Sequence, residues 1–91
     1  MIRKRIVVTG VVQGVGFRWS ARDVARKLGV VGFAFNRADG AVEVEAEGEP
    51  AAVLRMLAWL SDGPPGSQVT AVDVTDLEPV GDDGFRIIAR Q

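Results

Sequence analysis

Apolar and polar positions in the first third of the chain change from a strand-like to a helix-like spacing. Residues 3–12 are dominated by β-branched side chains and end at Gln13 and Gly14, which predicts a strand. From residue 17 the apolar positions recur at helical spacing in one stripe, made of Phe17, Ala21, Val24, Ala25 and Leu28. Gly29 follows Leu28, and two basic residues lie in the turn before it, as is typical of a helix end, so a helix is expected over residues 17–28.

The middle of the chain predicts a hairpin and a second helix. Residues 30–37 form an apolar run with aromatics, typical of a buried strand, and Asp39 and Gly40 predict a tight turn after it. Valine, alanine and glutamate then alternate over residues 42–47, the period of a half-exposed strand. Pro50 suits the first turn of a helix. The core stripe of that helix comprises Val53, Met56, Leu57 and Leu60.

The end of the chain predicts two more strands. The Gly-Pro-Pro-Gly sequence at 63–66 breaks the second helix, and strands are expected over residues 69–77 and 85–89. The order is βαββαβ plus a short C-terminal strand, which indicates an α+β, ferredoxin-like fold: an antiparallel sheet with two helices on one face. No repeat or linker separates a second domain, so residues 1–91 are expected to form one domain. This fold hosts many functions, so function has to come from a site.

Composition excludes several kinds of chemistry. The 91 residues are 47% hydrophobic, enough for one core, and contain neither cysteine nor histidine. Disulfides, Ser-His-Asp triads and Cys- or His-ligated metal sites are therefore excluded. The basic start followed by apolar residues has some features of a signal peptide, but Thr9 and Gly10 interrupt the run. With no membrane span in the sequence, a cytoplasmic protein is expected.

Charge is distributed unevenly along the chain. Residues 1–40 carry a net charge of +6 and residues 41–91 a net charge of −7. These halves form either two solvated faces of opposite sign or a positive region that focuses an anionic ligand. In both cases Arg22 and Arg26, four residues or about one helical turn apart, make a local basic patch.

The loop between the first strand and the first helix has the composition of an anion site. Gly14 and Gly16 permit positive φ and a close approach of the backbone to a ligand. The helix that follows directs free N–H groups and its positive dipole end to the same place, and Arg18 adds a planar guanidinium. The alternative is a tight turn with a solvated arginine. The sequence has neither a third glycine at the spacing of a dinucleotide-binding motif nor a Gly-Lys-Ser/Thr sequence, which disfavours a nucleotide site.

Residues 12–18, Val-Gln-Gly-Val-Gly-Phe-Arg, resemble the signature of the acylphosphatase family. The run over residues 29–43 resembles the same family, and the Gly-Pro-Pro sequence at 63–65 is similar to its exit from the second helix. The resemblance covers nearly the whole chain, in order and at the family's spacing.

Acylphosphatases hydrolyse the mixed anhydride of a carboxylic acid and phosphate, so the resemblance implies a small-molecule acyl phosphate as substrate. It implies a substrate-binding loop that consists of Gln13, Gly14, Val15, Gly16, Phe17 and Arg18. The implied catalytic residues are Arg18, which binds phosphoryl oxygens, and Asn36, which positions the attacking water. No metal or organic cofactor and no nucleic-acid or membrane partner are implied, and a monomer is expected.

Some residues invite other interpretations. Asn36 could instead cap the hairpin at Asp39. Phe35 stands where the family commonly has a polar or basic residue, but strand alternation places it on the face opposite Asn36, so catalysis is expected to survive. Trp19 and Ser20 are expected to serve helix-start packing and capping rather than chemistry.

Two rival functions remain open at this point. The chain could be an accessory acyl-phosphate-binding domain, like the acylphosphatase-like unit of larger carbamoyl-processing maturation proteins. Its starting Met1 and the lack of a linker favour a free-standing protein. An RNA-binding module is disfavoured because the third strand presents glutamates and aromatic residues are only 7% of the chain.

Overall fold

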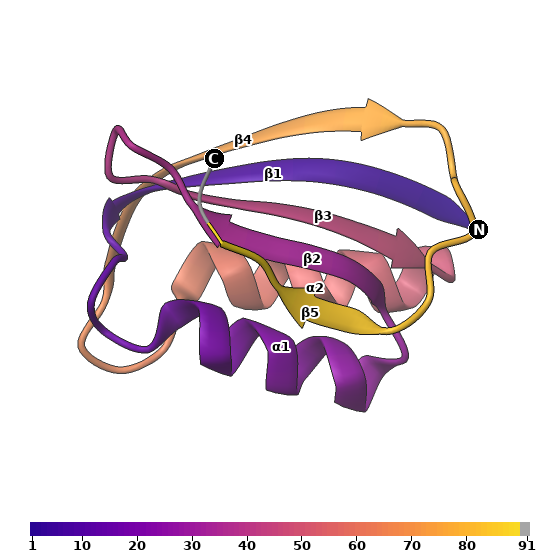
Figure 1. Cartoon of the computed structure of the whole chain (residues 1–91), viewed down its shortest axis with the longest axis horizontal. Helices are drawn as coiled ribbons and strands as arrows, with labels where there is room; N and C mark the ends of the chain where they lie inside the picture. Colours follow the sequence, from indigo (N-terminus) through magenta and orange to yellow (C-terminus); the bar gives the residue numbers. More distant parts are fainter. Residues whose placement is uncertain (90–91) are drawn as a thin grey trace.

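The computed structural model describes residues 1–89 and consists of a five-stranded sheet and two helices (Figure 1). The elements in chain order are β1 (Ile2–Val11), α1 (Phe17–Leu28), β2 (Val31–Asn36), β3 (Val42–Gly48), α2 (Pro50–Asp62), β4 (Gln68–Leu77) and β5 (Phe85–Ile87). The expected βαββαβ order with a short C-terminal strand is confirmed. Helix α1 has the expected bounds, while β2 and β5 are shorter than their apolar runs.

The strands are arranged in the order β4-β1-β3-β2-β5. All pairs among the first four strands are antiparallel, as expected. The last pair differs from the expected antiparallel sheet, because β5 runs parallel to β2. The chain crosses from β4 at one edge to β5 at the other and returns in the direction of β2, which makes the sheet mixed.

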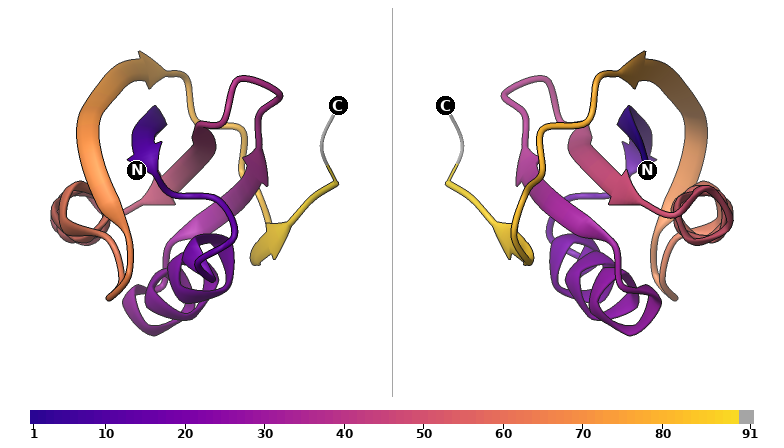
Figure 2. Two further views of the ribbon diagram at one scale, coloured as in Figure 1. Left: turned by 90° about the vertical axis from the view of Figure 1, so that its left-hand side faces the viewer. Right: turned by 90° about the vertical axis from the view of Figure 1, so that its right-hand side faces the viewer.

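Both helices cover the same face of the sheet (Figure 2). The apolar positions of β3 face them, since Val42, Val44 and Ala46 are completely buried. The two helical stripes contribute the other side of this core, and their fully or nearly fully buried residues are Phe17, Ala21, Ala25, Val53, Met56 and Leu60. The period-2 and helical patterns in the sequence therefore identified the core correctly.

On the opposite face of the sheet, charged side chains near one end bind one another and the β4–β5 connection. Glu47 was expected to be half-exposed but is 3% exposed, and its carboxylate accepts hydrogen bonds from Arg3 and from the amides of Val80 and Gly81. These bonds attach the β4–β5 connection to the sheet. The Val80 amide holds the pKa of Glu47 below its ordinary value, and Arg3 adds to this effect against the opposing influence of burial.

The β1–α1 loop and the β2–β3 hairpin lie at the same end of the molecule, on the left in Figure 1. The α1–β2 and β4–β5 connections lie at the other end. Residues of the first loop and of the hairpin, more than twenty positions apart in sequence, therefore meet. Among residues 1–89, neither helix has the length and apolar character needed to cross a membrane.

Candidate active site

Helix α1 begins at a pair of left-handed glycines. Gly14 and Gly16 have φ of 76° and 75°, and Gly16 is the N-cap residue. No side chain caps this end and no acidic residue lies in the first turn. The first helical bond runs from the Ser20 amide to the Gly16 carbonyl, so the amides before it point out of the helix end without a helical acceptor. This geometry suits an anion.

Phe17, the first residue of α1, anchors the loop to the core. Its side chain is 2% exposed, and its ring lies 5.5 Å from that of Trp59 in α2 at an angle of 57°. The main chain of Phe17 can therefore serve the loop while its ring fixes the position of the helix start. The loop over residues 13–18, called the cradle below, is therefore anchored to the core and is not a freely solvated turn.

Arg18 is the second residue of α1 and is only partly buried. Within the described part of the chain, no carboxylate forms an ion pair with it. In contrast, the sheet and its turns hold four paired arginines, which are Arg3, Arg5, Arg37 and Arg86. Carboxylates of the negative half thus neutralise part of the positive half, but none of those described pairs with Arg18 at the start of α1.

Gln13 joins the cradle to the β2–β3 hairpin. Its side-chain nitrogen donates to the carbonyl of Arg37 at 2.8 Å and to that of Ala41 at 3.0 Å. The amide donor of Gln13 is therefore committed to the hairpin. No sequence pattern predicts this connection, because it depends on two carbonyls that only the fold brings near.

Asn36 is the last residue of β2, on the same face as the buried Ala34 and thus toward the helices. Its Oδ1 atom is buried and, within residues 1–89, has no hydrogen-bond partner. The alternative role as a hairpin cap is not observed. Asp39 caps the turn instead, through a 3.1 Å bond from the Ala41 amide, which lowers the pKa of Asp39 together with Arg37. A buried acceptor without a partner is costly and commonly marks a functional group.

The aromatic residues near the site differ in their roles. Phe35 packs on Phe33 with ring centroids 6.2 Å apart, on the face away from the helices as expected. The expectation for Trp19 and Ser20 was wrong: Trp19 is 57% exposed and no side chain caps the helix. Gly16 is the N-cap residue of α1, and Phe17 rather than Trp19 packs the helix start on the core.

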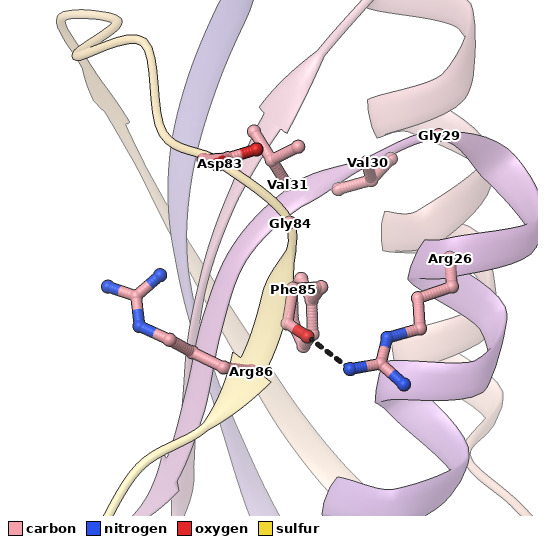
Figure 3. Close-up of a pocket in the computed structure, with 8 residues that line it drawn as sticks. All are labelled: Arg26, Gly29, Val30, Val31, Asp83, Gly84, Phe85 and Arg86. Atoms are coloured by element: carbon pink, nitrogen blue, oxygen red, sulfur yellow. Dashed lines mark hydrogen bonds between the residues drawn. The ribbon is translucent and has the colours of Figure 1, made fainter.

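A hollow of about 410 Å³ lies at the opposite end of α1 (Figure 3). It is lined by the end of α1 and the start of β5, and Arg26 there donates to the Phe85 carbonyl at 3.2 Å. Arg86 is also engaged, with Gly32 and Asp82. Both arginines of this hollow therefore have partners within the described residues, unlike Arg18. In residues 1–89, no three Asp or Glu side chains gather closely enough to hold a metal ion.

The sequence model of the acylphosphatase family matches residues 4–87. The chain belongs to the acylphosphatase family. The expected resemblance is thereby confirmed, and the chain is an acylphosphatase-type hydrolase. An acylphosphatase of Anaeromyxobacter dehalogenans is 52% identical over 83 residues, which are 91% of this chain and 89% of that protein. One of Thermococcus kodakarensis is 46% identical over 87 residues, 96% of each.

Solved acylphosphatase structures confirm the fold. The crystal structure of the Bacillus subtilis acylphosphatase superposes with a TM-score of 0.93 at 39% identity, over 97% of this chain and 99% of that one. The present chain also resembles a small part of a larger protein. Full-length HypF, solved in a phosphate- and nucleotide-bound form, matches with a TM-score of 0.88 at 27% identity, over 99% of this chain but 12% of that chain.

Proposed function

We propose that this chain hydrolyses acyl phosphates at the N-terminus of α1, without a metal, using Arg18 and Asn36 as catalytic residues. One observation carries the proposal, and it holds within residues 1–89. The start of α1 has no side-chain cap, Arg18 in its first turn has no carboxylate partner, and the buried amide oxygen of Asn36 has no hydrogen-bond partner. Each of these groups lacks the partner that its chemistry needs. A phosphoryl group and a water molecule supply all of them at once.

The phosphoryl group is held by main-chain amides and one side chain. The proposed binding residues are Gln13, Gly14, Val15, Gly16, Phe17 and Arg18. The left-handed glycines and the first turn of α1 direct N–H donors and the positive helix end at the anion. The guanidinium of Arg18 pairs with two phosphoryl oxygens at once. Because these donors are fixed before binding, they stabilise charge as it develops in the transition state.

Asn36 positions the nucleophile. Its Oδ1 accepts a hydrogen bond from the attacking water, and its Nδ2 donates to a phosphoryl oxygen. The water oxygen bonds to phosphorus while the bond between phosphorus and the acyl oxygen breaks, and the water proton passes to a phosphoryl oxygen. The leaving carboxylate has a conjugate acid with a pKa of about 4, so it departs without protonation. A chain without histidine can therefore catalyse this reaction by orientation and charge stabilisation.

The test is release of inorganic phosphate from benzoyl phosphate and acetyl phosphate in the presence of EDTA. Turnover above the spontaneous rate, competitively inhibited by inorganic phosphate, is expected. Circular dichroism establishes that the protein under test is folded. Phosphate binding without turnover would contradict the proposal and favour an accessory binding domain.

A further inference from the structure

Three arginines lie on one face of α1 at intervals of one helical turn: Arg18, Arg22 and Arg26. None of the three takes part in an ion pair with a carboxylate of the described residues, in contrast to the arginines of the sheet. Arg26 is occupied by the carbonyl of Phe85. Arg22, one helical turn from the proposed phosphate site, therefore carries a positive charge that neither a carboxylate nor a carbonyl of the described residues binds.

Arg22 is held against the indole of Trp19. Its Cζ atom lies 4.3 Å from the ring centroid, and its Nε atom is buried without a hydrogen-bond partner among the described residues. The indole itself is 57% exposed, which is unusual for so large an apolar group. The contact with the ring thus orients the guanidinium, by a cation–π interaction.

The contact with Trp19 directs the guanidinium of Arg22 toward the N-terminal end of α1, where the cradle lies. Side chains on a helix lean toward its N-terminus, and Trp19 lies in the first turn next to Arg18. Arg22 follows Arg18 by four residues, so the two lie on one face of the helix with their main-chain positions about 6 Å apart along its axis. An exposed platform and an unpaired, oriented cation beside a binding site together resemble a second subsite for an anion.

We propose that Arg22, oriented by Trp19, is a specificity-determining residue that binds a carboxylate on the acyl group of the substrate. The inference rests on the proposed function, because it assumes that the phosphoryl group is bound at Arg18. A four-carbon acyl chain spans the separation of one helical turn, so acyl phosphates of short dicarboxylic acids fit both cations. Arg22 thereby favours an acyl phosphate that ends in a carboxylate over its neutral counterpart.

The test compares fumaroyl phosphate with crotonoyl phosphate, which differ in a terminal carboxylate and a methyl group. The trans double bond keeps the carboxylate away from its own acyl carbon, so spontaneous cleavage does not obscure the comparison. The ratio of kcat/KM for the two substrates is measured by phosphate release. Arg22→Gln is expected to lower this ratio about tenfold, the effect of losing one charge-assisted hydrogen bond. Trp19→Leu, which keeps the charge but removes its platform, is expected to lower it by a smaller factor.

The matched control is Arg55→Gln on the exposed side of α2, which removes the same charge from the other helix and is expected to leave the ratio unchanged. Raised salt is expected to reduce the ratio in the unmodified protein but not in Arg22→Gln. An unchanged ratio in folded Arg22→Gln, with both substrates still hydrolysed, would overturn the subsite and leave the proposed function intact. Failure of the unmodified protein to hydrolyse either substrate would overturn the proposed function, and the subsite with it.

Discussion

The side-chain amide of Gln13 donates a hydrogen bond of 2.8 Å to the main-chain carbonyl of Arg37, the residue that follows Asn36. A second bond, of 3.0 Å, reaches Ala41 on the far side of the same hairpin. The loop proposed to bind phosphate and the residue proposed to position water are thereby joined. Their relative placement depends on this one side chain as well as on the sheet.

Gln13→Ala is expected to lower kcat for benzoyl phosphate by about tenfold to a hundredfold, because small displacements of catalytic groups are costly. Loss of two part-buried hydrogen bonds should also lower the free energy of unfolding by about 1–3 kcal/mol. Steady-state kinetics and urea unfolding measure the two effects. Gln68→Ala, at an exposed position of β4, is the control. A rise in the inhibition constant of phosphate with kcat unchanged would show that the side chain of Gln13 contacts the phosphate instead of joining the loop to the hairpin.

Arg18→Ala is expected to weaken inhibition by inorganic phosphate and to lower kcat/KM by about 10²–10³-fold, the range typical of a removed transition-state donor. Arg18→Lys keeps the charge but not the planar fork, so it should recover only part of the loss. Kinetics with phosphate as inhibitor provide the measurement. Arg55→Ala, a solvent-exposed arginine of α2, should behave as the unmodified protein. Equal phosphate inhibition in Arg18→Ala and the unmodified protein would refute the role of Arg18.

Asn36→Ala is expected to separate rate from binding. If the amide positions water, kcat falls by about 10²–10³-fold while the inhibition constant of phosphate changes little. The free energy of unfolding should not fall, because the variant removes a buried oxygen that has no partner among residues 1–89. Inhibition by phosphate and urea unfolding give the two readouts. Parallel loss of phosphate affinity and rate would instead assign Asn36 to phosphate binding.

Glu47 predicts a dependence of stability on pH. Its pKa is lowered in the folded state from an ordinary value of 4.5, chiefly by the Val80 amide. The unfolded chain therefore binds more protons as the pH falls through this value, and acid favours unfolding. The stabilisation from Glu47 should be complete above pH 5 or so and decline below it. Glu47→Gln should flatten this part of the profile in urea unfolding measured between neutral and acidic pH. An equally steep decline in Glu47→Gln would assign the acid sensitivity to other carboxylates.

The order of elements, the core and the glycine turn before α1 followed from the sequence alone. Periodicity identified the buried stripe that begins at Phe17, because burial on one face imposes its period on the apolar residues. Gly14 and Gly16 predicted a loop with positive φ before the helix start, because glycine is the residue that adopts a left-handed backbone without strain. These properties are local, so neighbouring residues suffice to predict them.

The tertiary structure alone decided which groups have partners. Glu47 shares the alternation of Glu43 and Glu45, yet only contact with the β4–β5 connection buries it. The same holds at the site. The sequence offered both a catalytic and a capping role for Asn36. In the fold Asp39 caps the turn, and Oδ1 of Asn36 has no hydrogen-bond partner among residues 1–89. Hydrogen bonds between residues distant in sequence depend on positions set by the whole fold, so a local sequence pattern does not predict them.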